Sequence, residues 1–389
     1  MSKNIVIIGG GISGLACLHY LNKKYKNDST VSITLLEKDD FIGGTIRTLS
    51  ENNALFEMGP NGFINSRAET LEFLQDLGLL KRLIQASPQT NKRFVSLNDF
   101  LYPIPTEPFS FIMSNLLSPL DKWKIIRGLL SRKKLRDHDS VYDYFSRFGK
   151  KTANLFADSF VRGIYAGNSR DLNMKEAFPQ IAYKSKRDKT SVLKIAPFLK
   201  RGKLTSFPNG MTELVNMLFS QYKNQIVLNA DVENIEEILK QFHVKTKSKT
   251  FYADQIFIST PAYVASKLLK SLSSSLSNVL EHIDYAPVVL TGFILNKSDF
   301  KKLPEGFGYL IPSTQQKYIL GVLFESNVFP NRCPKDKVLL RVMMGGVDNA
   351  HILQRSKEEL IKLAYKEVIQ VFKITAKPTG VFFKVLSKA

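Results

Sequence analysis

The chain has 389 residues and a formal net charge of +20 at pH 7. Hydrophobic residues make up 44% and charged residues 23%, which is typical of a globular protein long enough for two or three domains with a substantial core. The sequence contains no low-complexity tract, no internal repeat and no apolar run approaching the roughly 18–20 residues that span a bilayer.

The first predicted element is a short apolar strand, 5–8, which leads directly into Gly9-x-Gly11-x-x-Gly14 and a helical pattern over 15–25. Gly9 permits the tight turn from strand to helix, Gly11 lets the backbone approach a pyrophosphate without a Cβ, and Gly14 lets the helix pack closely on the strand. The amides at the helix N-terminus would face the phosphates. Alone, such a motif is weak evidence, because glycine-rich turns are common.

A second strand is predicted over 31–36, and it ends in Glu37, 23 residues after Gly14. An acidic side chain at this place accepts hydrogen bonds from the hydroxyls of the adenosine ribose. Strand, helix, second strand and acidic terminus are therefore all in place. Together they predict a dinucleotide-binding domain of the Rossmann type.

The residues after Glu37 indicate which dinucleotide is bound. Gly43 and Gly44 precede Arg47, and Gly59-Pro60-Asn61 follows soon after. This arrangement of paired glycines and an arginine resembles FAD-dependent amine oxidases and their relatives. The resemblance implies FAD as the cofactor, with Val232 contacting the adenine through its backbone, and it implies the following cofactor-binding residues: Gly9, Gly11, Ser13, Gly14, Glu37, Lys38, Gly43, Gly44, Arg47, Gly59, Pro60, Asn61 and Val232.

From about residue 88 the composition changes. Prolines interrupt an aromatic and aliphatic stretch, 100–120, and a basic segment with seven Lys or Arg follows over 122–136. A second basic segment, 184–203, carries eight basic residues against one acid. Apolar turns beside basic clusters are typical of proteins that lie on an anionic membrane, so segment 88–203 predicts a helical lobe that contacts one.

The alternatives to a membrane surface for these charges are an acidic small molecule, nucleic acid and a solvated basic face. A solvated basic face on a lobe that packs only on itself stays open. Nucleic acid is disfavoured, because no nucleic-acid-binding fold signature accompanies the charge.

After residue 204 the pattern returns to alternating helix and strand, and a buried strand over 255–258 rejoins the nucleotide-binding sheet. Beyond 285 the chain is rich in strand signals, with a covering helix over 357–372. We predict an α/β chain (α+β overall) with a discontinuous FAD-binding Rossmann-like domain. Its parts are 1–87 and 204–284, separated by the helical insert 88–203 and followed by a mixed-sheet substrate domain, 285–389.

Cys17 and Cys333 are the only cysteines, and two such distant thiols are typical of a reduced, cytosolic protein. The five histidines show no metal-ligand spacing. The N-terminus enters the first strand at once, which leaves no room for a leader peptide. The predicted location is the cytoplasm, on the inner face of a bacterial cytoplasmic membrane, and a homodimer is left open.

Several later stretches, taken in order, resemble the oxygen-dependent protoporphyrinogen oxidases. They are Asn91-Lys-Arg-Phe94, Ser159-Phe-Val-Arg-Gly-Ile-Tyr-Ala-Gly167, Phe207-Pro-Asn-Gly-Met211 and Gly306-Phe-Gly-Tyr-Leu-Ile-Pro312. The resemblance covers nearly the whole chain. It implies oxidation of protoporphyrinogen IX to protoporphyrin IX in haem biosynthesis, with O2 as the acceptor and H2O2 released.

The resemblance also implies a substrate site. Arg93 matches the position that pairs with a propionate of the tetrapyrrole, and a guanidinium meets a carboxylate with two parallel hydrogen bonds. Leu320 and Met343 match the residues that sandwich the rings, and the remaining residues implied to line the cavity are Gly163, Gly167 and Leu310. The flavin carries the chemistry, so no catalytic acid, base or metal is nominated.

Other functions stay open at this point. Coproporphyrinogen III has two further propionates, which Arg67, Arg162 or the basic segments would meet. The family pattern continues with a glycine-rich stretch that closes over the flavin, and this sequence ends before it, so an inactive remnant that keeps membrane or partner binding is an alternative. The last alternative is that the chain is another oxidase of the amine-oxidase group.

Overall fold

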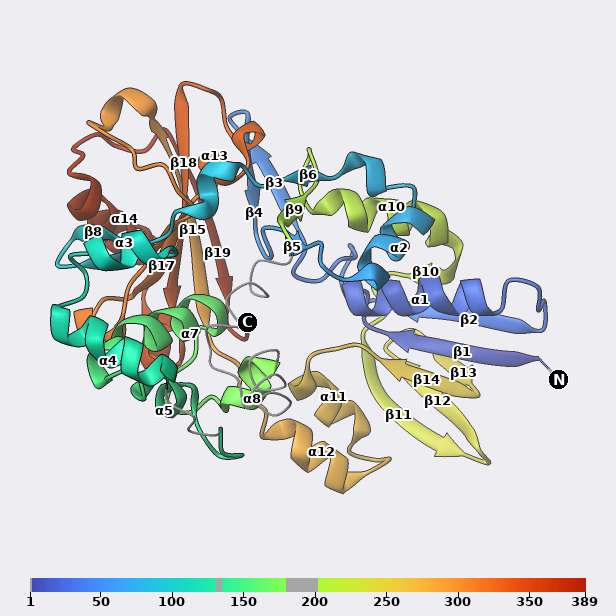
Figure 1. Ribbon diagram of the computed structural model, residues 1–389. Coiled ribbons are helices and arrows are strands. Elements are labelled where there is room, and N and C mark those ends of the chain that lie inside the picture. The colour runs from blue at the N-terminus through green and yellow to red at the C-terminus, as the bar shows by residue number, and fades with distance from the viewer. Residues whose placement is uncertain (1, 131–134, 180–201) are drawn as a thin grey trace. The chain divides into compact units, whose positions relative to one another are not determined.

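A computed structural model describes residues 2–130, 135–179 and 202–389, and the chain divides into two compact units (Figure 1). The first unit consists of Met1–Leu49, Glu57–Ile84 and Leu204–Asp284, and the second of Ser50–Phe56, Gln85–Lys203 and Tyr285–Ala389. The predicted helical insert and the predicted substrate domain thus belong to the same unit, and their division into two domains stays a prediction. The basic segment 184–203 falls almost entirely outside the described residues.

The first unit is built on a four-stranded sheet in the order β10-β2-β1-β14, with every pair parallel. Strands covered on both faces are apolar throughout, and β1 has this character from Ile5 to Ile8. The four strands are β1 (Lys3–Ile8), β2 (Val31–Leu36), β10 (Ile226–Val227) and β14 (Gln255–Ile258).

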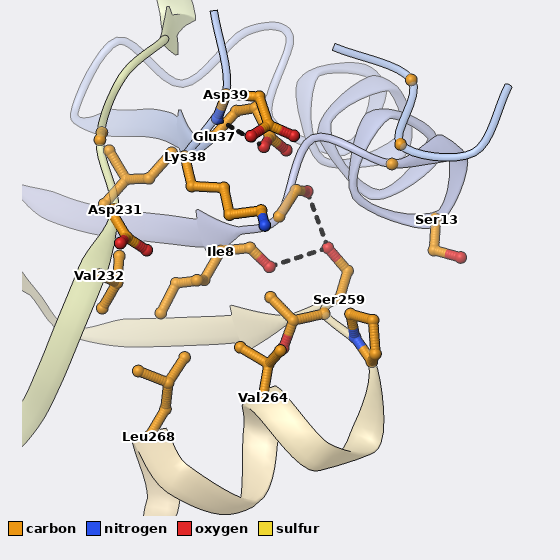
Figure 2. Close-up of a pocket in the computed structure, with 18 of the residues that line it drawn as sticks. Ile8, Ser13, Glu37, Lys38, Asp39, Asp231, Val232, Ser259, Val264 and Leu268 are labelled. Carbon is orange, nitrogen blue, oxygen red and sulfur yellow. Dashed lines mark hydrogen bonds between the residues drawn. The ribbon is translucent and has the colours of Figure 1, made fainter. Parts of the chain in front are cut away.

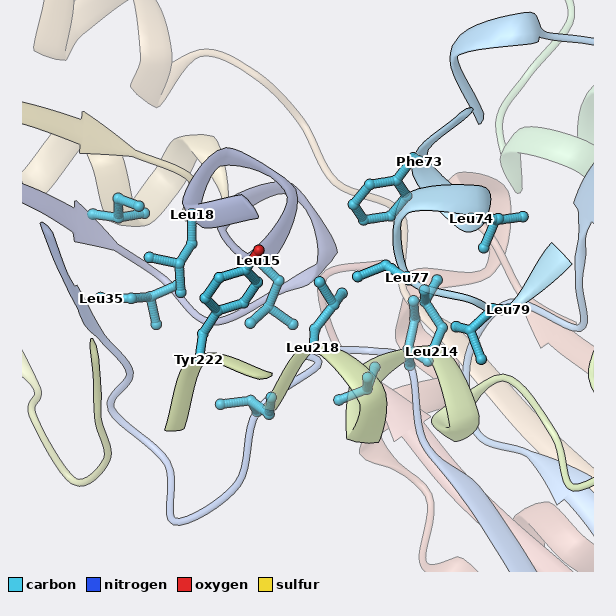
Figure 3. Close-up of a cluster of buried hydrophobic side chains, with 14 of the residues drawn as sticks. Leu15, Leu18, Leu35, Phe73, Leu74, Leu77, Leu79, Leu214, Leu218 and Tyr222 are labelled. Carbon is cyan, nitrogen blue, oxygen red and sulfur yellow. The ribbon is translucent and has the colours of Figure 1, made fainter. Parts of the chain in front are cut away.

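Helices cover one face of this sheet. Ile5 and Ile7 of β1 join a buried cluster with Leu15 and Leu218, which lie on two of the covering helices. Figure 3 shows the leucine-rich packing of this cluster. The helices of this unit are α1 (Ile12–Lys24), α2 (Ala68–Asp76), α10 (Thr212–Tyr222), α11 (Ala262–Leu269) and α12 (Ser274–Glu281).

The opposite face carries a second, antiparallel sheet. Val6 and Ile8 alternate with Ile5 and Ile7 along β1 and pack with Val244. The covering strands are β11 (Val232–Ile238), β12 (Gln241–Thr246) and β13 (Thr250–Ala253), and the short pair β5 (Phe63–Ile64) and β9 (Leu204–Ser206) completes the unit. The predicted discontinuous α/β architecture is confirmed.

The second unit contains a mixed sheet in the order β19-β15-β18-β17-β16-β7-β8. Only β16 and β7 run parallel among its neighbouring pairs. Its strands are β7 (Phe94–Leu97), β8 (Phe100–Pro103), β15 (Val288–Asn296), β16 (Gly308–Leu310), β17 (Ile319–Phe324), β18 (Lys337–Gly345) and β19 (Gly380–Leu386).

Two parts of this sheet differ from the sequence interpretation. The hairpin β7–β8 lies within the stretch that was assigned to the helical insert, and β19 was not predicted. Phe382 of β19 stacks on Phe56 with ring centroids 4.9 Å apart, and Gly292 of β15 makes room for the ring of Phe56. Short strands where the chain passes between the units are β3 (Thr48–Glu51), β4 (Ala54–Glu57) and β6 (Ile84–Gln85).

The longest helix that the structure describes in the second unit packs on its sheet through Leu360, Ala364 and Val368. It begins with a capping box in which Ser356 and Glu359 each accept the other's backbone N–H. Among the described residues, the helices of this unit are α3 (Pro108–Met113), α4 (Pro119–Leu130), α5 (Val141–Ser146), α6 (Lys150–Thr152), α7 (Asp158–Tyr165), α8 (Met174–Ala177), α13 (Glu325–Val328) and α14 (Lys357–Phe372).

Helices α3 and α4 expose an apolar face. The Lys122 ammonium donates to the carbonyl of Ile112 at 2.5 Å and joins the two helices, whose inner side chains pack with Val95. The outer side chains, all at least half exposed, form what we call the α3–α4 face: Phe109, Ile112, Met113, Leu120, Trp123, Ile126 and Leu130. No helix of the described residues is long and apolar enough to cross a membrane.

Candidate cofactor and substrate sites

A cavity of about 390 Å³ opens at the carboxyl ends of β1, β2 and β14 (Figure 2). Ligands of open parallel sheets bind at this edge, where connections leave the sheet in opposite directions. The polar and glycine positions that line it are Gly9, Gly11, Ser13, Glu37, Lys38, Asp39, Gly43, Gly44, Thr45, Asp231, Ser259 and Thr260.

The glycine turn after β1 is shaped by close backbone approaches. A Cβ at Gly14 would lie 2.0 Å from the carbonyl oxygen of Gly9 and 2.5 Å from Oγ of Ser259, so only glycine fits there. A Cβ at Gly11, by contrast, would meet no atom within 4 Å. Gly11 therefore presents open space at the N-terminus of α1, where the helix dipole favours an anion.

Glu37 is held by two backbone amides. Its Oε2 accepts the N–H of Gly10 at 2.6 Å, and its Oε1 accepts the N–H of Asp39 at 3.0 Å. A Cβ at Gly10 would lie 2.8 Å from that Oε2. Gly10 thus belongs to the site although it was not singled out, and its place in the middle of three consecutive glycines was the signal that could have found it.

The paired glycines pack against the first turn. The N–H of Gly43 donates to the carbonyl of Gly10 at 2.7 Å, and Gly43 and Gly44 have φ values of +105° and +59°, which favour glycine. Arg47 does not line the cavity. It is exposed, and its guanidinium lies 4.9 Å from the centre of the Phe41 ring.

The segment from Glu57 to Asn61 packs behind these glycines. A Cβ at Gly59 would lie 1.9 Å from the carbonyl oxygen of Thr45. Glu57 is fully buried and accepts the hydroxyl of Thr48 at 2.8 Å and the N–H of Met211 at 2.8 Å. Both polar atoms of the Asn61 side chain are buried without a hydrogen-bond partner among the described residues.

The predicted cofactor residues thus fall into two groups. Those that line the cavity are Gly9, Gly11, Ser13, Glu37, Lys38, Gly43, Gly44 and Val232. Those that do not are Gly14, Arg47, Gly59, Pro60 and Asn61.

One wall of the cavity is apolar. Val232, Val264 and Leu268 face the polar side across the pocket (Figure 2). The Oγ of Thr260 is buried there without a partner among the described residues, and the sequence interpretation did not single out this residue. Open space at Gly11, a fixed carboxylate and an apolar wall fit the phosphates, ribose and adenine of a dinucleotide.

Charge within the cavity is mixed. Lys38 is the only lysine or arginine among the lining residues, and Figure 2 shows its ammonium directed into the pocket. It accompanies the carboxylates of Glu37, Asp39 and Asp231. In the part of the chain that the structure describes, no group of three or more His, Cys, Asp or Glu could hold a metal ion.

The predicted substrate residues all belong to the second unit. Gly163 of α7 and Gly321 of β17 both approach the side chain of Leu310, because a Cβ would lie 2.4 Å and 2.9 Å respectively from its Cδ2. Leu310 is therefore flanked by two glycines, of which only Gly163 was predicted.

The other predicted apolar residues are distributed more widely. Leu320 is only 2% exposed and packs with Ala166, and Met343 is half-buried against the same cluster. Gly167 faces elsewhere, since a Cβ there would lie 2.8 Å from Leu172. The structure thus brings together Gly163 with Leu310 and Leu320 with Met343, while Gly167 packs toward the helices.

Arg93 precedes β7 and has an exposed side chain whose guanidinium lies 5.1 Å from the centre of the Phe307 ring. Surrounding protein atoms displace water and lower the pKa of Arg93 below its ordinary value. Arginine nevertheless stays charged at neutral pH. The nearby Lys92 is 3.7 Å from Glu305.

The sequence model of the family described as "Flavin containing amine oxidoreductase" matches residues 12–383. Mitochondrial protoporphyrinogen oxidase of Nicotiana tabacum is 28% identical over 100% of this chain and 84% of its own length. Coproporphyrinogen III oxidase of Bacillus subtilis is 25% identical over 97% of this chain and 84% of its own length.

A solved structure has the same fold. The crystal structure of a "Putative protoporphyrinogen oxidase" from Exiguobacterium sp. 255-15 superposes with a TM-score of 0.86, at 22% identity, over 99% of this chain and 86% of that one. The predicted resemblance to porphyrinogen oxidases is confirmed at the level of sequence similarity, and the likeness of the structures extends it to the fold.

Proposed function

Because this chain belongs to the family of flavin-containing amine oxidoreductases, we propose that it oxidises protoporphyrinogen IX to protoporphyrin IX, with O2 as acceptor, as a step of haem biosynthesis. The chain is an oxidoreductase related to porphyrinogen oxidases, and its cofactor is FAD. The substrate, the acceptor and the pathway are the proposed part.

The observation that carries the proposal is the cavity beside the glycine turn. Glu37, fixed by the N–H groups of Gly10 and Asp39, is suited to accept the ribose hydroxyls of the adenosine. Gly11 leaves space for the pyrophosphate at the N-terminus of α1, and the lining residue Val232 would meet the adenine. Bound FAD would supply the hydride acceptor, and the chain would bind and orient it.

The remaining cofactor residues would act from outside the cavity. Gly14, Gly59 and Pro60 would fix the backbone that surrounds the cofactor. Arg47 would supply positive charge near the phosphates. Asn61 has two buried polar atoms without a partner among the described residues, and a flavin carbonyl or ring N–H would satisfy them.

In the second unit, Arg93 would pair with a propionate of the substrate. The guanidinium is exposed and has no carboxylate partner among the described residues, and its planar fork matches a carboxylate. The apolar residues that would contact the tetrapyrrole rings are Gly163, Gly167, Leu310, Leu320 and Met343. Sulfur makes favourable contacts with aromatic rings, which suits Met343 to this task.

The test begins with the visible spectrum of the purified chain, followed by anaerobic addition of protoporphyrinogen IX. Flavin bands that bleach with substrate and return in air, together with porphyrin fluorescence, are expected. A chain that binds FAD but is not bleached by any porphyrinogen would overturn the substrate proposal. A colourless chain that cannot be loaded with FAD would instead support the inactive remnant.

Coproporphyrinogen III is the second candidate substrate, because the Bacillus subtilis relative is named for its oxidation. The same bleaching experiment with both porphyrinogens separates the two. For the shared propionate contact, Arg93→Ala should raise the Michaelis constant by about ten- to a hundredfold without releasing FAD, since a charge-assisted pair contributes about 1.5–3 kcal/mol. Lys92→Ala is the matched control, and an equal effect in both variants would remove Arg93 from the site.

A peripheral membrane location is the second part of the proposal. Seven large apolar side chains form the α3–α4 face, and Lys122, Lys124 and Arg127 lie on the same helix, α4. Apolar side chains that enter the acyl boundary, with cations beside anionic headgroups, are what such binding requires. We place this face on the anionic inner leaflet of a cytoplasmic membrane.

Co-flotation with vesicles tests this location. The chain should float with vesicles that contain phosphatidylglycerol and much less with pure phosphatidylcholine. Phe109→Ser combined with Trp123→Ser should abolish flotation, whereas Val279→Ser on α12, an equally exposed apolar position, should not. If the variant with both Phe109→Ser and Trp123→Ser floated as well as the wild-type chain, the α3–α4 face would not be the membrane contact.

A further inference from the structure

Helix α7 carries Gly163 of the proposed porphyrinogen site, and an ion pair between buried Arg162 and exposed Asp348 fixes this helix. Nη1 of Arg162 lies 3.1 Å from Oδ2 of Asp348, and the Arg162 side chain is only 4% exposed. Its Nη2 donates to the carbonyl of Lys317 at 3.4 Å. Arg162 therefore bonds to two loops at once, one after β18 and one between β16 and β17.

The loop between β16 and β17 receives further bonds. The N–H of Ser313 donates to buried Asp158 at the start of α7, at 2.6 Å. The side-chain amide oxygen of Gln315 accepts the N–H of Asn98 at 2.7 Å, and the Lys317 ammonium pairs with Asp99. Leu310 ends the strand before this loop and Leu320 lies in the strand after it, so the loop connects two of the proposed ring contacts.

The loop after β18 is tied to the other end of α7. Ala166, which ends the helix in a left-handed conformation, accepts the N–H of Val347 at 2.9 Å. Asn168 donates to the second carboxylate oxygen of Asp348 at 3.1 Å. Helix α7 thus contacts both loops through polar bonds at its beginning, middle and end.

A contact that served only the stability of the fold would not require an arginine–aspartate ion pair. Burying a guanidinium costs free energy, and a packed apolar residue often stabilises a fold equally well. An ion pair does fix one geometry, because the arginine fork aligns two acceptors at once. A five-residue π-helical stretch, Ala153–Ala157, directly precedes α7, and such stretches frequently occur at functional sites.

We infer that the Arg162–Asp348 pair is a positioning device, which holds the Gly163 face of α7 at a fixed separation from Leu310 and so sets the shape of the porphyrinogen site. The inference rests on the proposed function. Neither residue is a catalytic residue, because both act through the helix and loops that they join. Loss of the pair should displace α7, and a displacement near 1 Å can lower a rate by roughly a hundredfold.

The test compares three variants with the FAD-loaded full chain. Arg162→Met removes the charge at similar volume, Arg162→Lys keeps the charge without the fork, and Asp348→Asn weakens the pair from its partly exposed side. Arg170→Met is the matched control, because Arg170 is an exposed arginine stacked on Tyr142. The readouts are FAD content, the thermal midpoint, the Kd for the porphyrin product and the rate of flavin bleaching at saturating porphyrinogen.

Arg162→Met should weaken porphyrin binding and slow bleaching, each by about tenfold, with FAD content unchanged. Arg162→Lys should recover part of the loss, and the double variant with Asp348→Asn should be no worse than Arg162→Met, because both substitutions remove one interaction. The inference would be overturned if the losses caused by Arg162→Met and Asp348→Asn were additive in the double variant. It would also be overturned if Arg170→Met lost as much porphyrin affinity and bleaching rate, or if Arg162→Met had wild-type kinetics per bound FAD. A wild-type chain that no porphyrinogen bleaches would overturn the proposed function instead.

Discussion

The cofactor cavity of the first unit and the proposed substrate residues of the second unit differ in the atoms that define them. At the glycine turn the limiting contacts are with the backbone oxygen of Gly9 and the backbone amides that hold Glu37. At α7 the limiting contact is the end of the Leu310 side chain. Backbone atoms cannot move without shifting a strand, whereas a leucine can change rotamer. The first site should therefore tolerate fewer substitutions.

The sharpest test of this difference is Gly14→Ala. The new methyl group would meet the carbonyl oxygen of Gly9 at 2.0 Å, so strand and helix must separate. We expect a loss of about 3 kcal/mol in the free energy of unfolding, as for a severe overpacking, and loss of FAD. Denaturant unfolding of the FAD-free chain and a flavin absorbance titration measure the two effects.

Gly11→Ala is the control for that experiment. Nothing lies within 4 Å of the added methyl group, so the FAD-free chain should lose no more than about 1 kcal/mol. FAD affinity should still fall, because the methyl group enters the space left for the pyrophosphate. If Gly14→Ala and Gly11→Ala lowered the free energy of unfolding equally, the idea that Gly14 serves packing and Gly11 serves the approach of the pyrophosphate would be wrong.

The cysteines provide a second comparison, since each unit contains one. Burial raises the pKa of Cys333 to about 11, and burial also raises the pKa of the Cys17 thiol, so both should react slowly with iodoacetamide at pH 8. Saturating FAD should slow alkylation of Cys17 at least tenfold and of Cys333 less than twofold, because a ligand stabilises the unit that binds it. Peptide mass spectrometry gives both rates, and equal protection would show that the units open together.

A smaller effect is expected at the start of α5 in the second unit. Oγ of Ser140 accepts the N–H of Asp143 at 3.0 Å, and the Asp143 carboxylate accepts the hydroxyl of Ser140 at 2.8 Å. Ser140→Ala should lower the free energy of unfolding by about 1 kcal/mol at pH 7.

This capping effect should depend on pH. The hydrogen bond from Ser140 lowers the pKa of Asp143. The ionised carboxylate therefore stabilises the fold above its unfolded pKa of about 4, and this stabilisation is lost as the pH falls through the folded pKa. The difference between wild type and variant should therefore be smaller at pH 3 than at pH 7 in urea unfolding. A constant difference would mean that the carboxylate takes no part in the cap.

The smallest effect on stability should come from Gly163→Ala. The nearest atom is the end of the Leu310 side chain, and alanine favours a helix over glycine by about 1 kcal/mol. The net change in the free energy of unfolding should stay below about 1 kcal/mol, while porphyrin affinity changes because Leu310 is displaced. A destabilisation as large as that of Gly14→Ala would remove the contrast between the two glycines.

Much of the cofactor site could be predicted because its signals are local. The first strand, the glycine turn and Glu37 lie within 37 residues, and each residue type follows from the geometry of one βαβ unit. Thr260 was missed because it reaches the cavity only through the pairing of β14 with β1, in which Gln255 lies beside Ile5. The unpartnered state of Asn61 is likewise a tertiary property that no spacing reveals.

In the second unit the local signals were weaker. Aromatic residues and prolines over 100–120 masked the hairpin β7–β8, whose place in the sheet depends on the pairing of Phe94 with Tyr309. Helix α14 was predicted with its observed bounds, since its apolar period is regular, and the structure shows that a capping box of Ser356 and Glu359 fixes its start. Arg162 could not be recognised as a paired residue, because its partner Asp348 lies 186 positions away.

The discontinuity of the first unit also has a consequence during synthesis. Leu15 and Leu35 emerge early, but their core partner Leu214 and the strand that flanks β1 on its other side, β14, follow about 200 residues later. At roughly 5–20 residues per second, the ribosome leaves the N-terminal βαβ segment without these partners for about 10–40 s. During that interval its apolar faces are open to chaperones or to other nascent chains. Translation speed through the intervening segment should therefore influence the yield of folded, flavin-loaded protein.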